Sequence, residues 1–315
     1  MEDFVIYTKS YAPDVEVTKR LKESIDKHNI ENVPFYVSVP KSDINLFKDK
    51  LGTSDYTLIA DEDIYQLTTN LDGWRTQQII KTHFNTLKVA KNYLCPDSDN
   101  FFINDFKKND FMATKDTIYT IMTDAPLENR IIIEGLNNKP YYGICFYRTV
   151  RAIRKMLDNE DITKLYAWGP PPYPWNCQVW DEIQDMLKSS GMNMEQFFIQ
   201  LEQTTGAMPR EAVLYGEYLL KYRSIDIYPS GNWFLADGSP FANEKVYDFY
   251  NEGKFGKTAI DPTFIKKYYL GLGLQDGRTT REKGINWNGQ KSIEITEKLK
   301  KLSHIKYEGH INHHA

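Results

Sequence analysis

The sequence has few of the features that mark secreted, membrane-spanning or nucleic-acid-binding proteins. Its 3 cysteines are far apart in 315 residues, and no two of them have the spacing of a zinc site, so a reduced, cytosolic chain is expected. No apolar run approaches the roughly 18 residues of a membrane span, and the N-terminus lacks a signal peptide's basic and apolar parts. A net charge of −4 leaves no basic excess for nucleic-acid phosphates. These absences predict a soluble, cytoplasmic protein without a nucleic-acid partner.

The residues that are abundant are hydrophobic and aromatic. A hydrophobic fraction of 41% is ample for a large core. The aromatic fraction of 14% is high, and aromatic rings stack on sugars and nucleobases. The codon bias of an AT-rich genome explains this number equally well, so composition alone does not identify a ligand.

Short apolar runs alternate with helical patterns through the first hundred residues. Strands are expected at residues 4–8, 35–39, 56–60 and 92–96, and helices at 15–28, 44–51 and 75–91. This order predicts an α/β fold with a mostly parallel sheet flanked by helices. Ligands of such sheets bind beyond the carboxyl ends of the strands, so the loops at 8–14, 61–63 and 97–100 should converge on one crevice.

The rest of the chain is predicted to complete one domain and add an extension. Helices are expected at 147–165 and 177–204, and a late strand at 225–228. Residues 168–175 contain four prolines, which remove four backbone donors, and are expected to form an ordered loop. We predict one main domain over 1–238, with two halves at 1–106 and 107–238. Residues 239–315 would form an extension of helices and loops packed on it.

Two carboxylates follow the strand expected at 92–96. Asp97 and Asp99 are two residues apart, so in an extended segment both side chains face the same way. Two like charges held this close usually need a cation between them, and a divalent metal is the common solution. An ordinary turn is the alternative, since Asp, Ser and Asn all favour turns.

The context of this pair resembles a known enzyme class. Gly73-Trp-Arg-Thr-Gln-Gln, Lys81 and then Asp97-Ser-Asp-Asn are similar to the nucleotide-sugar-dependent glycosyltransferases of the GT-A type, and more narrowly to an uncharacterised bacterial group linked to surface-polysaccharide synthesis. The resemblance covers about residues 1–235 and is specific only at 73–106 and 209–219. It implies a GT-A-like (Rossmann-like) catalytic domain over 1–238, with a donor half at 1–106 and an acceptor half at 107–238. It also implies a bound Mn²⁺ or Mg²⁺ that neutralises the donor diphosphate.

The resemblance also implies roles on the donor side. Asp99 is the stronger metal ligand and Asp97 the weaker, with Asp97 also near the donor. Gln77 and Gln78 would read a uracil edge or sugar hydroxyls, Lys81 would assist at phosphate, and Asp14 would contact the nucleoside. For Lys81 the alternative is a solvated lysine on an amphipathic helix. For Asp14, as for Asp61, it is an ordinary loop acid.

The proton acceptor is expected at the start of a late helix. Inverting enzymes of this type often open that helix with Glu-x-x-x-Tyr, which Glu211 and Tyr215 match. Glu217 is the rival base. The alternative for Glu211 is a carboxylate that only stabilises the helix dipole, worth a few tenths of a kcal/mol.

Aromatic side chains are expected to bind the acceptor sugar. Trp168, Tyr173 and Trp175 lie on the proline-rich loop, and Tyr215 shares a helix face with Glu211. The alternative is a loop anchored by its own aromatics.

The resulting prediction is a hexosyltransferase-like enzyme of capsule or lipopolysaccharide synthesis. Its partners would be a nucleotide-sugar donor, such as a UDP-sugar, and a glycan or lipid-linked glycan acceptor. Peripheral association with the inner membrane or with a polysaccharide-assembly complex stays open. A haloacid-dehalogenase-like phosphatase, which also uses Asp-x-Asp after a strand, and a non-catalytic carbohydrate-binding protein are the alternatives.

Overall fold

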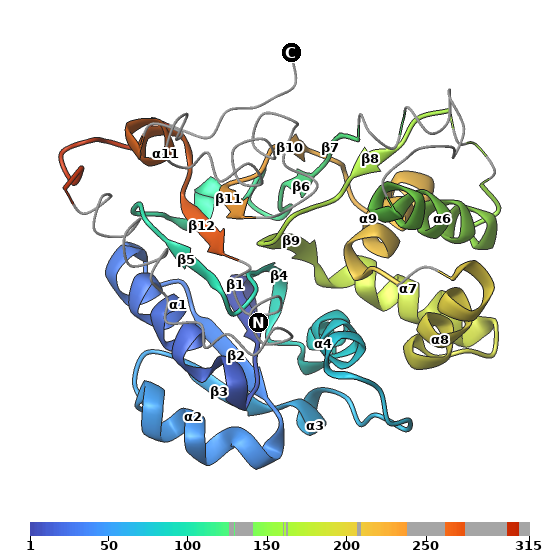
Figure 1. The fold of residues 1–315 in the computed structure, drawn as a ribbon, viewed down its shortest axis with the longest axis horizontal. Coiled ribbons are helices and arrows are strands. Elements are labelled where there is room, and N and C mark those ends of the chain that lie inside the picture. The colour runs from blue at the N-terminus through green and yellow to red at the C-terminus, as the bar shows by residue number, and fades with distance from the viewer. Residues whose placement is uncertain are drawn as a thin grey trace.

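The fold is built on one central sheet. The computed structural model describes residues 1–125, 129, 141–159, 161, 163–206, 209–237, 262–274 and 301–308. Five strands pair in the order β3 (Thr57–Ala60), β2 (Phe35–Val39), β1 (Glu2–Lys9), β4 (Ala90–Cys95) and β9 (Tyr173–Asn176). The first four are parallel and β9 is antiparallel to β4. The α/β prediction of a mostly parallel sheet flanked by helices is therefore confirmed (Figure 1).

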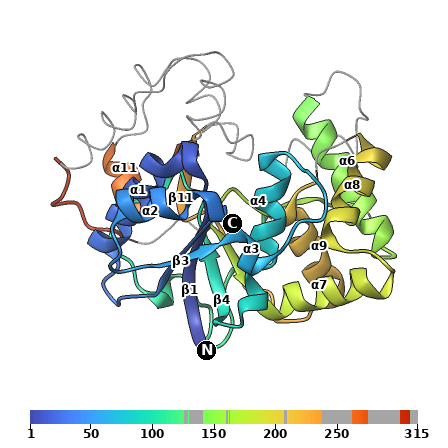
Figure 2. The same ribbon diagram turned by 90° about the horizontal axis from the view of Figure 1, so that it is seen from below.

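Alternation along β1 explains how both faces of the sheet are covered. Phe4 and Ile6 pack in one hydrophobic cluster with α1 (Val15–His28) and α2 (Ile44–Leu51). Val5 and Tyr7 point the other way, into a cluster with α4 (Gly73–Thr82). Side chains of a strand alternate between faces, so β1 belongs to both cores. Figure 2 shows α1 and α2 on one side of the sheet and α4 on the other.

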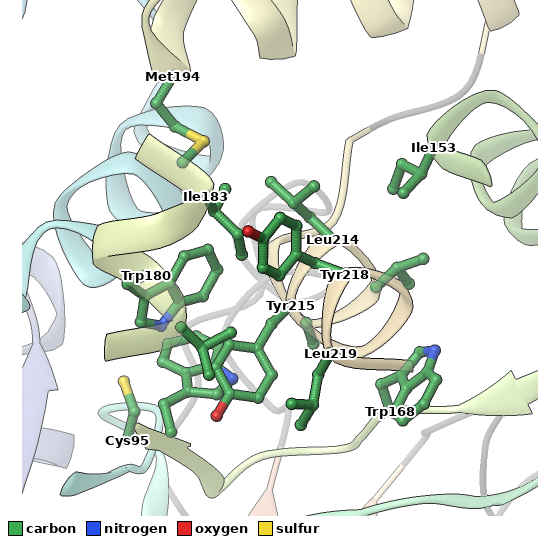
Figure 3. Close-up of a cluster of buried hydrophobic side chains, with 14 of the residues drawn as sticks. Cys95, Ile153, Trp168, Trp180, Ile183, Met194, Leu214, Tyr215, Tyr218 and Leu219 are labelled. Carbon is green, nitrogen blue, oxygen red and sulfur yellow. The ribbon is translucent and has the colours of Figure 1, made fainter. Parts of the chain in front are cut away.

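Four helices extend the second core away from the sheet. They are α6 (Tyr141–Met156), α7 (Cys177–Ser189), α8 (Met194–Thr205) and α9 (Glu211–Tyr222). Their inner faces form one apolar cluster that is continuous with the sheet, and Trp168, Trp180 and Tyr215 belong to it (Figure 3). The start of α9 is thereby fixed relative to the sheet.

Shorter elements complete the described chain. They are η1 (Ala12–Asp14), η2 (Lys41–Asp43), α3 (Asp61–Ile64), η3 (Phe84–Leu87), β5 (Asn100–Phe102), η4 (Lys108–Asp110), β6 (Thr120–Ile121), β7 (Thr123–Asp124), β8 (Tyr166–Ala167), β10 (Pro229–Ser230), β11 (Phe234–Asp237), α11 (Pro262–Tyr268) and β12 (Gly271–Leu274). None of the described helices is long and apolar enough to cross a membrane.

Several predicted boundaries were wrong for local reasons. The helix expected to 91 ends at Thr82, and η3 after it stops at Lys88, whose φ of 53° is left-handed. Gly191, with a φ of 73°, separates α7 from α8 where one helix was expected. The helix expected at 147–165 begins earlier, at Tyr141, and ends at Met156. Residues 225–228 form no strand, and β10 begins just after them.

The proline-rich segment is only partly a loop. Tyr173–Asn176 forms β9, which pairs with β4 at the edge of the sheet. Proline has no backbone N–H to donate. Pro174 is tolerated in β9 because an edge strand has one side without a partner strand in the sheet, so no hydrogen bond between strands is lost there.

The described part of the extension expected at 239–315 is integrated into the domain. Most of the extension lies outside the described residues, but β12 within it pairs with β11 and with β5, which directly follows the acidic pair in the sequence. Helices and loops were expected here, and the described part contains the strand β12 as well as the helix α11. The boundary at 238 falls between two strands of one small sheet.

Candidate active site

The loops after β1, β3 and β4 meet at one edge of the sheet. Thr8 Oγ1 donates to the carbonyl of Pro96 at 2.8 Å, which joins the ends of β1 and β4. Lys9 Nζ lies 3.1 Å from Asp61 Oδ2 in a buried ion pair that joins β1 to β3. The predicted convergence is confirmed, although 61–63 forms the start of α3 rather than a loop.

Asp97 and Asp99 belong to a hydrogen-bonded turn. The amide of Asn100 donates to the carbonyl of Asp97 at 3.0 Å, and the amide of Asp97 donates to Asn100 Oδ1 at 2.9 Å. The extended geometry expected for these residues was therefore wrong. Ser98, inside this turn, donates from Oγ to Asp14 Oδ2 at 3.1 Å, which brings Asp14 to the acidic pair.

Lys81 is a buried cation beside this turn, not a solvated lysine. It is 2% exposed, and its Nζ pairs with Asp97 Oδ1. Burial alone would lower its pKa, but the charge of Asp97, with smaller contributions from Cys95 and Glu211, raises the pKa above its usual value. Lys81 therefore stays charged inside the protein.

Asp99 is held in an unfavourable environment for a carboxylate. Burial, with the like charges of Asp97 and Asp14, raises its pKa to about 8, although Lys81 and Arg20 act in the opposite direction. A divalent cation would remove this penalty. Carboxylate and hydroxyl oxygens are also the donors that Mg²⁺ and Mn²⁺ prefer.

The acidic pair would not enclose a metal ion by itself. Among the described residues, no group of three or more His, Cys, Asp or Glu side chains is arranged as a metal site. Asp97 and Asp99 thus fit an ion whose other ligands come from a bound anion or from water.

Glu211 faces the same cation from another element. It is the first residue of α9 and is 7% exposed. Its pKa is raised by burial and by the charge of Asp97, while Lys81 acts to lower it. Lys81 thus links the base candidate electrostatically to the acidic turn.

Gln78 holds the start of α9 in place. Its Oε1 accepts from the amide of Glu211 at 3.0 Å, and its Nε2 lies 3.4 Å from the carbonyl of Trp74. Because both ends of the amide are engaged and the residue is buried, Gln78 positions Glu211. Neighbouring Gln77 is half-buried, and its side chain makes no hydrogen bond to any described residue.

Glu217 has a structural role that excludes it as the base. Arg154 Nε donates to Glu217 Oε2 at 2.6 Å, and Trp168 Nε1 donates to Glu217 Oε1 at 3.2 Å. Glu217 is 1% exposed, so both oxygens are occupied inside the protein. Of the two predicted bases, only Glu211 belongs to the acidic cluster.

The predicted acceptor residues do not form a binding surface. Trp168, Trp175 and Tyr215 are 4%, 2% and 2% exposed, and the Tyr215 hydroxyl accepts from the amide of Asn176 at 2.9 Å. The cavity that they line is about 10 Å³, room for no more than one water. Tyr173 is half-buried and stacks on Trp175 with ring centroids 5.0 Å apart. The acceptor prediction was wrong for the three buried residues, because their rings pack into the core.

Sequence reasoning missed two buried ion pairs. Lys9 lies at the end of the first strand and Asp61 directly after the third. Because the carboxyl ends of parallel strands meet at one edge of the sheet, this pair could have been predicted. The Arg154–Glu217 pair joins α6 to α9, and no spacing in the sequence indicates it.

The sequence was compared with known proteins. It matches a family described as "Family of unknown function (DUF6492)" over residues 4–190, a range that contains Asp14, Gln78, Lys81, Asp97 and Asp99 and ends before Glu211. No curated protein matches the sequence. Because the match spans more than half of the 315 residues, the chain belongs to the DUF6492 family.

Proposed function

We propose that this protein is a metal-dependent glycosyltransferase that moves a sugar from a nucleotide-diphosphate donor to a glycan acceptor in surface-polysaccharide synthesis. One observation carries the proposal. Two carboxylates, a buried lysine and a buried glutamate from three separate elements gather at the carboxyl edge of a mostly parallel sheet. The GT-A resemblance of the same residues supports it.

The donor side needs neutralisation of the leaving diphosphate. Asp99 and Asp97 would hold Mn²⁺ or Mg²⁺, which when bound supplies positive charge to the diphosphate oxygens. Lys81 adds a fixed positive charge beside Asp97. Asp14, held by Ser98, completes the acidic wall that favours a cation.

Glu211 is the group that would remove the acceptor's proton. As the acceptor oxygen forms its bond to the anomeric carbon, its proton passes to the Glu211 carboxylate. The bond from that carbon to the diphosphate oxygen breaks, and its electron pair leaves with the nucleotide. A single displacement of this kind inverts the anomeric centre. Burial favours the role, because a raised pKa makes a carboxylate a better base near neutral pH.

A donor screen tests the proposal directly. Nucleotide-sugar hydrolysis would be measured with and without Mn²⁺, together with protection against thermal unfolding by UDP plus Mn²⁺. Metal-dependent hydrolysis and protection are expected. Turnover of a simple phosphomonoester, without protection by UDP plus Mn²⁺, would favour the phosphatase alternative. No effect of any nucleotide and no turnover would favour a carbohydrate-binding protein.

Asp99→Asn is the sharpest variant for the metal step. We expect it to fold and to lose metal-dependent turnover. Near-normal turnover at saturating donor would contradict the assignment. Asp97→Asn is a less clean test, because it also removes the partner of buried Lys81 and so lowers stability.

A further inference from the structure

A second concave site lies on the helical half of the molecule, outside the acidic cluster. A groove of about 480 Å³ lies between α6 and the end of α8, lined by Arg148, Arg151, Ala152, Lys155, Asn159, Thr204 and Thr205. Figures 1 and 2 show both helices on the part of the molecule opposite α1 and α2. The volume falls within the range of about 300–1,000 Å³ that is typical of small-molecule sites.

The charged side chains among the described residues of the groove all carry positive charge. Arg148, Arg151 and Lys155 are exposed, and none of the described residues that line the groove is acidic. Across the described residues, no ion pair joins any of the three to a carboxylate, whereas exposed Lys88 and Lys164 pair with Asp181 and Asp124. In a protein of net charge −4, this is a local concentration of positive charge without a paired carboxylate in the part of the chain that the structure describes.

Helix geometry places the three cations together. Positions three and four apart share a face of a helix, so 148, 151 and 155 form one stripe about 10 Å long. The stripe lies opposite the face that buries Phe146, Val150 and Ile153. Arg151 also lies over the Tyr147 ring, 5.7 Å from its centroid.

A solvated amphipathic face explains only part of this arrangement. The helix dipole favours Lys155 in the last turn, but Arg148 lies two turns earlier. Like charges at these spacings repel by a few tenths of a kcal/mol per pair. An anion in the groove would turn this repulsion into attraction.

We propose that this groove binds a phosphate-bearing ligand with at least two negative charges. Arginine forks match phosphate oxygens in bidentate geometry, and the lysine adds a compact third charge. The stripe is longer than one phosphate, which favours a diphosphate or two neighbouring phosphates. The source is either a soluble diphosphate or the headgroups of anionic lipids. The proposal goes beyond the transferase activity and does not depend on it.

The test uses the full chain and two probes. Binding of inorganic pyrophosphate is measured by calorimetry in EDTA, so that a metal at the acidic turn contributes nothing. Co-sedimentation is measured with vesicles of phosphatidylglycerol and phosphatidylcholine, and with vesicles of phosphatidylcholine alone. The test variant is Arg148→Gln/Arg151→Gln/Lys155→Gln. The control, Lys41→Gln/Lys48→Gln/Lys115→Gln, removes the same charge from exposed residues outside the groove.

The two probes separate the two sources. The wild type should bind at least one probe, and the groove variant should lose affinity for it by about tenfold or more, since charge-assisted contacts are the strong ones. Pyrophosphate binding indicates a soluble ligand, and binding to the anionic vesicles alone indicates lipid headgroups. The control and Asp99→Asn should both bind like the wild type. Wild-type protein that binds neither probe, or a groove variant that binds no worse than the control, would overturn the proposal.

Discussion

At the scale of single residues, the candidate active site depends on one buried lysine. Lys81 pairs with Asp97 and is close enough to Glu211 for each charge to affect the other's pKa. Burial, together with the like charges of Asp97 and Asp14, raises the pKa of Asp99 to about 8, and the charge of Lys81 offsets only part of this effect. An acid-rich site with one fixed cation attracts a second, exchangeable cation.

The two glutamates of α9 should respond differently to the same substitution. Glu211→Gln should lower turnover about 100-fold, the usual worth of a general base, with little change in melting temperature or donor affinity. Glu217→Gln should instead destabilise the fold by about 3–5 kcal/mol, because it leaves buried Arg154 without its partner charge. Turnover and chemical denaturation measured on both variants separate the roles. A Glu211→Gln enzyme with full turnover would contradict the assignment.

The pKa of Asp99 predicts the pH dependence of stability in the metal-free protein. The carboxyl has a pKa of about 8 when folded and 3.8 in its ordinary state. Between these values the folded protein holds a proton that the unfolded chain has lost, so stability falls as pH rises from about 4 to about 8. Asp99→Asn should flatten this slope and be more stable than the wild type near pH 8. Urea unfolding in EDTA across this range provides the measurement, and identical slopes would contradict it.

At the scale of elements, α4 and α9 build the site together. Gln78 and Lys81 are three residues apart on α4, so they share a face. Gln78 fixes the start of α9, and Lys81 neutralises Asp97. The position of α9 depends in turn on its packing against Trp168 and Trp180 (Figure 3).

Gly216 in α9 should be intolerant of even one added methyl group. A Cβ there would lie 2.0 Å from the indole of Trp168, which is 4% exposed and has little room to move. Gly216→Ala should therefore destabilise the protein by about 1–3 kcal/mol through overpacking. Gly73→Ala is the control, since a Cβ at Gly73 meets nothing within 4 Å. Equal melting temperatures for the two variants would contradict this packing.

Trp175 is expected to affect stability rather than acceptor binding. It is 2% exposed and packs edge-on against Trp180 with ring centroids 5.2 Å apart. Trp175→Ala should cost about 3–5 kcal/mol of stability and reduce donor hydrolysis and sugar transfer together. A raised acceptor KM with an unchanged melting temperature would restore the acceptor role that burial argues against.

At the scale of the whole molecule, a late segment of the chain pairs with a much earlier one. β12, from beyond residue 238, lies between β11 and β5, and its Leu272 packs in one cluster with Phe101 and Leu235. The segment directly after the acidic turn is therefore braced by residues some 170 positions later in the sequence.

Removing that brace should destabilise the domain. Leu272→Ala should cost about 2–5 kcal/mol, because Leu272 is 1% exposed. Ile30→Ala, at a residue that is 60% exposed, is the control and should be nearly neutral. Truncation after residue 238 should lower stability further than Leu272→Ala. A truncated protein as stable as the full chain would contradict an integrated extension.

Much of this fold could be predicted from the sequence, because local periodicity determines where strands and helices form. The runs at 4–8 and 35–39, and the helical spacing at 15–28, required no tertiary information. The acidic pair was found because it follows a strand, and parallel strands direct their carboxyl ends to one edge. The GT-A activity inferred from the same residues stays a proposal.

Burial was the property that periodicity could not supply. Lys81 lies on an amphipathic helix and Trp175 beside prolines, and both local patterns predict an exposed side chain. In the structure both are among the most buried side chains. The sequence by itself determined the order of strands and helices in the first hundred residues, and the edge of the sheet where charged side chains gather. Only the tertiary structure decided that Glu211 rather than Glu217 joins the acidic turn, since the choice depends on Arg154, which lies more than fifty residues away in the chain. Contacts between distant segments fix which charges meet, and no local pattern encodes them.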